Sequence, residues 1–194
     1  MSNGTQVLVA LKQYSASYSS SYPDATNTEF KSANEVFRLL FQEGILTDER
    51  IFGSPGSAFQ PDNEIGSPPN FEKALMPGEC HWMLLKGQWE TVPGETPILI
   101  ENALNSTWPP KWDTERPRSS LWADETPPKR GRSWPGSTVV VVRNNGSAAL
   151  EKLRPDGTLD WHSANNLGSD GESWIDKLTP EEVANLSYWD IEEK

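Results

Sequence analysis

Residues 7–24 have the sequence VLVALKQYSASYSSSYPD, and their spacing decides the first element of the fold. Apolar and aromatic side chains recur every three or four positions, which is the repeat of one helical face. These side chains are Val7, Leu8, Leu11, Tyr14, Tyr18 and Tyr22. Pro23 ends the segment, because the residue before a proline is pushed out of the helical conformation. The spacing therefore predicts an amphipathic helix over residues 7–22.

A second helix is indicated by residues 32–44, which have the sequence SANEVFRLLFQEG. Ser32 and Glu35 have the spacing of a capping box, in which each side chain bonds to the backbone of the other residue. The buried face of this helix consists of Val36, Phe37, Leu40 and Phe41. Gly44 stands where a helix ends in a left-handed residue. We expect a helix over residues 33–43.

Composition and charge limit the partners of the chain. Its 194 residues include 17 basic and 28 acidic side chains, which gives a net charge of −11. Nucleic acids and anionic membrane surfaces both favour a basic face, so neither is expected as a partner. The length fits one domain over residues 1–194. No window approaches the about 20 apolar residues that span a bilayer, and no signal-peptide pattern is present.

Short apolar runs between turns predict an antiparallel sheet. The expected strands lie at residues 81–85, 97–100, 138–142 and 148–153. The four valines at 139–142 are apolar on both faces and indicate a strand that is covered on two sides. Residues 179–182, TPEE, form another capping box and predict a helix near 180–187. Helices followed by an antiparallel sheet indicate an α+β fold.

Residues 105–136 are predicted to be an ordered insertion loop rich in tryptophan and proline. So much proline prevents a continuous ladder of backbone hydrogen bonds, while the tryptophans argue against disorder. Exposed indoles stack on sugar rings and are enriched at interfaces, so Trp108, Trp112 and Trp122 are candidate contacts for a glycan or protein partner. The competing interpretation is that these indoles clamp the loop onto the domain. Residues 137–194 are expected to supply further strands and a C-terminal segment.

Several short sequences resemble, in their order and spacing, the prepilin-type proteins of verrucomicrobia and planctomycetes. These proteins are related to type IV pilins and type II secretion pseudopilins. The matching sequences are YPD (22–24), NEVFR (34–38), DERIF (48–52), PDN (61–63), GECHW (78–82) and NGS (145–147). The family usually has asparagine at the position of Cys80 and aspartate at the position of Asn145.

The resemblance implies a pilin-like head, in which an N-terminal amphipathic helix packs on an antiparallel sheet. Residues 7–22 would be the second half of a longer helix, whose hydrophobic first half is missing from this sequence. The face that docks this helix consists of Val7, Leu8, Leu11, Tyr14 and Tyr18. The resemblance further implies a structural subunit and not an enzyme, with other pilin or pseudopilin subunits as partners. The full-length form would be membrane-anchored and face the periplasm or the exterior.

The residues available for catalysis or metal binding are few. Cys80 and His81 are adjacent, and adjacent side chains on a strand point to opposite faces, so we expect a buried thiol beside a structural histidine. No set of residues has the spacing of a zinc site, and none is selected as catalytic. Asp62, Asn63 and Glu64 are candidate ligands for a structural calcium, the one cofactor that the resemblance allows. A simple turn capped by the aspartate is the alternative.

A different function class also fits the sequence. The chain could be a secreted glycan- or protein-binding module that uses the exposed tryptophans of the insertion loop. A hydrolase built from two carboxylates has no supporting feature, since no spacing selects a pair.

Overall fold

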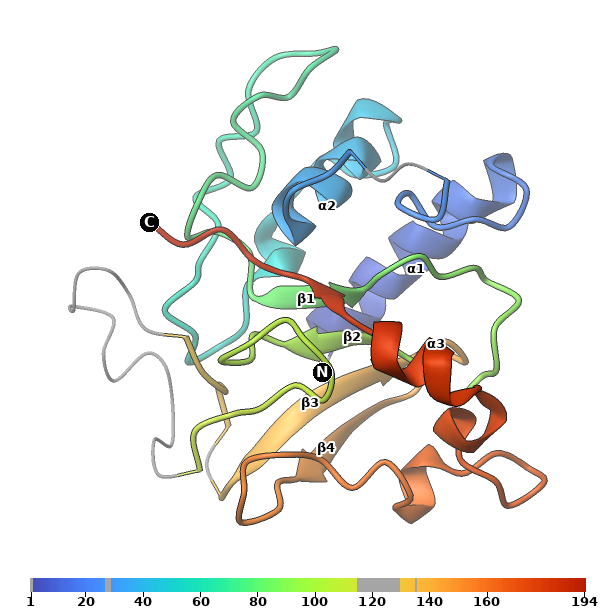
Figure 1. Cartoon of the computed structure of the whole chain (residues 1–194). Coiled ribbons are helices and arrows are strands. Elements are labelled where there is room, and N and C mark those ends of the chain that lie inside the picture. The colour runs from blue at the N-terminus through green and yellow to red at the C-terminus, as the bar shows by residue number, and fades with distance from the viewer. Residues whose placement is uncertain (1, 27–28, 115–129, 135) are drawn as a thin grey trace.

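The computed structural model describes residues 2–26, 29–114, 130–134 and 136–194. It is an α+β structure with an N-terminal helix and an antiparallel sheet (Figure 1). The α-helices are α1 (Ser2–Ser17), α2 (Ala33–Gln42) and α3 (Pro180–Asn185). The strands are β1 (Trp82–Leu85), β2 (Pro97–Glu101), β3 (Thr138–Arg143), β4 (Ala148–Lys152) and β5 (Tyr188–Trp189). Short 3-10 turns include η1 (Arg50–Phe52) and η4 (Trp174–Lys177).

Within the described residues the five strands form one sheet in the order β4-β3-β2-β1-β5, and every neighbouring pair is antiparallel. Ile100 of β2 lies opposite Met83 of β1 and opposite Val141 of β3. The four valines of β3 are fully buried, as expected for a strand that is covered on both faces. The four expected strands are confirmed, and β5 is an addition that the sequence did not predict.

Helix α1 covers one face of the sheet. Val7, Leu8 and Leu11 are at most 1 % exposed, and Tyr14 is 8 % exposed. At Gly4 the helix approaches the strands so closely that a Cβ atom would lie 2.8 Å from Val142 Cγ2. Glycine therefore permits the close packing of the first turn of α1 on β3.

The end of α1 differs from the prediction. The helix ends at Ser17, because Ser19 and Ser20 adopt positive φ angles of 53° and 65°. Serine side chains compete for backbone groups and weaken a helix, and here the Ser21 hydroxyl donates to the carbonyl oxygen of Tyr18 at 2.6 Å. Tyr18 thus lies beyond the helix and is 39 % exposed, so its assignment to the docking face was wrong.

Tyr22 is buried, although it is not part of α1. Its hydroxyl donates to Asn144 Oδ1 at 2.6 Å, just after β3. The last tyrosine of the periodic run is therefore anchored in the sheet by a hydrogen bond and not by a helical face.

Helix α2 follows the prediction closely and packs beside α1 and β1 (Figure 1). The Ser32 hydroxyl accepts from the Glu35 N–H at 3.1 Å. The Glu35 carboxylate accepts from the backbone N–H of Lys31 at 2.7 Å, one residue earlier than a capping box requires. Gly44 has a φ of 68° and ends the helix as expected.

The opposite face of the sheet is covered by aromatic side chains. Val142 faces α1, so the next residue, Arg143, points to the other side, where it bonds Asn166 and Glu151. On that side the ring of Trp108 lies 4.8 Å from that of Trp161 and 5.5 Å from that of Trp174. The described part of the insertion loop is therefore held against the sheet by indoles. No helix in the described ranges is long and apolar enough to span a membrane.

Candidate functional site

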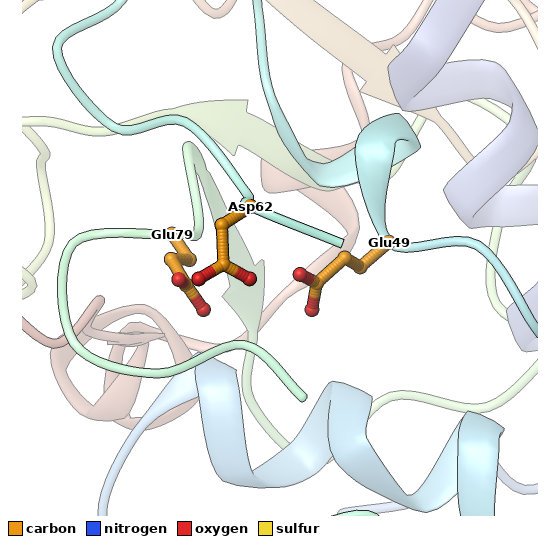
Figure 2. A group of neighbouring side chains, drawn as sticks. All are labelled: Glu49, Asp62 and Glu79. Carbon is orange, nitrogen blue, oxygen red and sulfur yellow. The ribbon is translucent and has the colours of Figure 1, made fainter. Parts of the chain in front are cut away.

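Three carboxylates meet at the base of a long surface loop. Asp62 and Glu79 stand at the two ends of the loop 62–79, and Glu49 reaches them from the residue before η1 (Figure 2). One carboxylate oxygen from each residue lies within 4.8 Å of the others. Glu49 is fully buried and Glu79 is 6 % exposed, whereas Asp62 is exposed. We call this group the carboxylate triad.

Backbone N–H groups position the two buried members of the triad. Glu49 accepts from the N–H of Asn63 at 2.6 Å and from that of Leu75 at 2.9 Å. Glu79 accepts from the N–H of Met76 at 2.6 Å. The loop residues thus wrap around the carboxylates and hold them close despite their like charges.

The two buried members of the triad, Glu49 and Glu79, have raised pKa values. Burial raises the pKa of Glu49, and the neighbouring Asp62 adds to the rise. Burial, together with the charges of Glu49 and Asp62, raises the pKa of Glu79 to about 7. Carboxylate oxygens are also the ligands that hard divalent cations prefer, and calcium takes six to eight oxygens in all.

The predicted calcium ligands are only partly brought together. Asp62 belongs to the triad, but the Asn63 side chain accepts from the Glu49 N–H at 3.3 Å, and Glu64 pairs with Lys73 at 3.4 Å. The Asp62 side chain also caps its own turn by accepting from the Glu64 N–H at 2.7 Å. The alternative prediction of a turn capped by Asp62 is therefore confirmed, while a calcium site on Asp62, Asn63 and Glu64 stays a prediction. Glu49 and Glu79 were missed because they lie far from Asp62 in the sequence.

His81 is the centre of a second polar cluster. Its Nδ1 lies 2.8 Å from the Ser57 hydroxyl, and its Nε2 lies 3.1 Å from Glu101 Oε1. Serine, histidine and glutamate in this order resemble a hydrolytic triad. However, His81 and Glu101 are fully buried and Ser57 is 5 % exposed, so no substrate reaches them in this structure. The cluster fits the expected structural role of His81.

Cys80 shares this sealed interior. It is fully buried, and its thiol donates to the carbonyl oxygen of Trp82 at 3.3 Å. Burial raises the pKa of the thiol to about 12, so the reactive thiolate is scarce at neutral pH. This agrees with the expectation of a small buried thiol.

The candidate glycan contacts do not form one exposed platform. Trp112 is 2 % exposed, and its Nε1 donates to the carbonyl oxygen of Glu101 at 3.3 Å, so its use as a stacking surface was wrong. Trp108 is partly buried against Trp161 and Trp174. Trp122 lies outside the described residues. The sequence pattern did not distinguish indoles that pack in the core from indoles that face solvent.

Comparisons with known proteins leave the family open: no protein-family model matches the chain, and neither a curated protein nor a solved structure matches it significantly.

Proposed function

We propose that this chain is the head domain of a pilin- or pseudopilin-like structural subunit. The observation that carries the proposal is the packing of the N-terminal helix α1 across an antiparallel sheet. Its buried side chains face strands β2, β3 and β4, and Gly4 lets its first turn touch Val142. A helix placed in this way can transmit the position of a membrane or filament segment to the head.

Two further features support a structural role. His81 and Cys80, the adjacent histidine and cysteine before β1, are fully buried. In contrast, the long loop 62–79 extends away from the sheet (Figure 1), and most of its residues are exposed or half-buried. Partner specificity in the proposed assembly would then reside in the loops, while the helix and the sheet provide the common framework.

The N-terminal sequence of the mature endogenous protein tests the proposal. We would fractionate cells of the source organism and identify the first residues of the protein by mass spectrometry in the membrane and soluble fractions. The expected result is a membrane-associated form with about 20 apolar residues that continue into α1. A mature protein that begins near Ser2 and stays soluble would overturn the proposal.

A further inference from the structure

Two tyrosines form a stacked pair at the end of α1. The rings of Tyr14 and Tyr18 lie with their centroids 4.1 Å apart and their planes inclined by only 10°. Tyr14 belongs to the last turn of α1, and Tyr18 follows directly after the helix. The two positions are four residues apart, which is the spacing of neighbours on one helical face. The pair therefore places one phenol ring face to face with the other.

The backbone around Tyr18 holds this arrangement in place. The N–H groups of Tyr18 and Ser20 both donate to the carbonyl oxygen of Ser15, at 3.1 Å and 2.9 Å. The Ser21 hydroxyl donates to the carbonyl oxygen of Tyr18 at 2.6 Å. Tyr18 is thus fixed against the last turn of α1, although it lies outside the helix.

Solvent reaches one member of the pair. Tyr18 is 39 % exposed, whereas Tyr14 is 8 % exposed. The other two tyrosines of the chain, Tyr22 and Tyr188, are fully buried. A reagent in solution therefore meets the tyrosines of this protein first at the stacked pair.

A proton acceptor lies beside the two hydroxyl groups. Interaction with the Glu43 carboxylate, followed by burial, raises the pKa of Tyr18. Burial, followed by the charge of Glu43, raises the pKa of Tyr14. Both phenols are therefore protonated at neutral pH. A phenol that loses an electron becomes a strong acid, and Glu43 is placed to take up the proton that is released.

The stacked geometry suits one reaction of phenols, which is oxidative coupling. Removal of one electron and one proton from a phenol leaves a phenoxyl radical, whose unpaired electron is shared with the ring carbons next to the C–O bond. Two such radicals join through a bond between these carbons. The bond forms from π orbitals that stand perpendicular to the rings, so rings that lie face to face already present the reacting orbitals to each other.

We propose that Tyr14 and Tyr18 are a site of oxidative modification, at which a one-electron oxidant couples the two rings to dityrosine. Each ring gives up one electron and the proton of its hydroxyl group, and one carbon–carbon bond forms. The hydrogen on each newly bonded carbon then moves to the oxygen, which restores both phenols. With a peroxide as the final oxidant, the two electrons and two protons reduce one hydrogen peroxide to two molecules of water.

The product is a covalent link across the last turn of α1. It would hold Tyr18 against the helix independently of the hydrogen bonds to Ser15. The inference does not depend on the proposed role as a pilin-like head.

Oxidation of the whole chain by a haem peroxidase and hydrogen peroxide tests the proposal. Trypsin releases residues 13–31 as one peptide, which contains Tyr14, Tyr18 and Tyr22 but no methionine, tryptophan or cysteine. We expect this peptide to become lighter by two hydrogen atoms and to show the fluorescence of dityrosine. In mass spectrometry, backbone cleavage between residues 14 and 18 should release no fragments, because the link closes that segment into a ring. Absence of this ring, whether the protein stays unmodified or couples elsewhere, would overturn the proposal.

Single substitutions identify the two partners. Tyr18→Phe removes the exposed phenol, and we expect it to abolish the ring. Tyr22→Phe is the matched control, because Tyr22 lies in the same tryptic peptide but is fully buried, and within the described residues it is not stacked on another tyrosine. Circular dichroism establishes that both variants are folded. A ring that persists in Tyr18→Phe, or that is lost in folded Tyr22→Phe, would contradict the assignment.

The free peptide separates the stacked geometry from simple closeness in the sequence. A synthetic peptide of residues 13–31 keeps the two tyrosines four residues apart but lacks the rest of the fold. Oxidised under the same conditions, it should give the ring in a yield about tenfold lower than the whole chain does. An equal yield would mean that the fold does not prepare the reaction.

The proton acceptor is tested by a further pair of variants. Glu43→Gln removes the carboxylate, and we expect it to slow ring formation at least about threefold. Glu172→Gln makes the same change at an exposed position away from the pair and should leave the rate unchanged. Equal rates in the two variants would refute the role of Glu43 in the coupling.

Discussion

The side-chain amide of Asn102 sets the tautomer of His81. Asn102 Oδ1 accepts from the Gly131 N–H at 2.6 Å, so the amide nitrogen must face His81. It donates to His81 Nδ1 at 2.9 Å. The neutral ring therefore carries its proton on Nε2, from which it donates to Glu101 Oε1 at 3.1 Å. This chain of bonds ties the start of β1, the end of β2 and residues 131–133 together.

Replacing Asn102 with aspartate should destabilise the fold. Asn102→Asp keeps an acceptor for Gly131 but removes the donor to His81, and it buries a charge beside Glu101. We expect the free energy of unfolding to fall by about 2–4 kcal/mol, measured by urea denaturation. Asn165→Asp is the control, because Asn165 is exposed and should change stability by less than about 0.5 kcal/mol. Equal stability of the two variants would refute the role of Asn102.

The docking of α1 on the sheet predicts that substitutions at two positions of this helix, two residues apart, differ strongly in their effect on stability. Leu11 is fully buried, whereas Val9 on the same helix is 50 % exposed. Leu11→Asp buries an unpaired carboxylate and should lower the free energy of unfolding by about 3–5 kcal/mol. Val9→Asp should have an effect of less than about 0.5 kcal/mol. Thermal melting followed by circular dichroism measures both, and similar melting temperatures would argue against this packing.

Elements with local signals could be predicted from the sequence. Ser32 is the N-cap of α2 and Thr179 is the N-cap of α3. Each side chain accepts a hydrogen bond from the backbone N–H three residues later in the chain. The four consecutive valines of β3 are branched and apolar on both faces, and this pattern predicted a strand that is covered on both sides. These signals depend on residues that are close in the chain, so no tertiary information was needed.

The end of α1 and the candidate sites could not be predicted in the same way. The spacing of the tyrosines predicted a helix up to Tyr22. Ser19 and Ser20 instead adopt left-handed conformations, and Tyr22 donates to Asn144, which is distant in the sequence. Strand β5 has two residues, which pair with β1, and Tyr188 also donates to the carbonyl oxygen of Ser106. Glu49 meets Glu79 because a loop closes between them. The anchoring of Tyr22, strand β5 and the meeting of Glu49 with Glu79 depend on contacts between remote segments, whereas α1 ends at local bonds made by its own serines.

The raised pKa of Glu79 predicts an unusual pH dependence of stability. Its folded value of about 7 exceeds its ordinary value of 4.5, so the folded state binds the proton more tightly than the unfolded state. This group therefore makes the fold less stable as the pH rises from about 4.5 to 7, and the loss persists at higher pH. Glu79→Gln removes the charge and should raise the melting temperature at pH 8, with little gain at pH 4.5.

A control variant at an exposed position and the addition of a cation complete the test of Glu79. Glu172→Gln serves as the control, because Glu172 is exposed and lies outside the triad. If Glu172→Gln raises the melting temperature at pH 8 as much as Glu79→Gln does, the effect reflects the net charge of the protein and not the triad. The same melts with calcium chloride ask whether a cation relieves the repulsion. A calcium-dependent rise that is lost in Glu79→Gln would place the ion on these carboxylates.

Cys80 should be inert in the folded protein. Its thiol is fully buried and its pKa is raised to about 12, so both access and thiolate formation are suppressed. We expect Ellman's reagent at pH 8 to label it at least about a hundredfold more slowly than a cysteine placed at exposed Ser169 by Ser169→Cys. In urea both thiols should react at similar rates. Rapid labelling of wild-type Cys80 under native conditions would mean that the β1 region opens frequently.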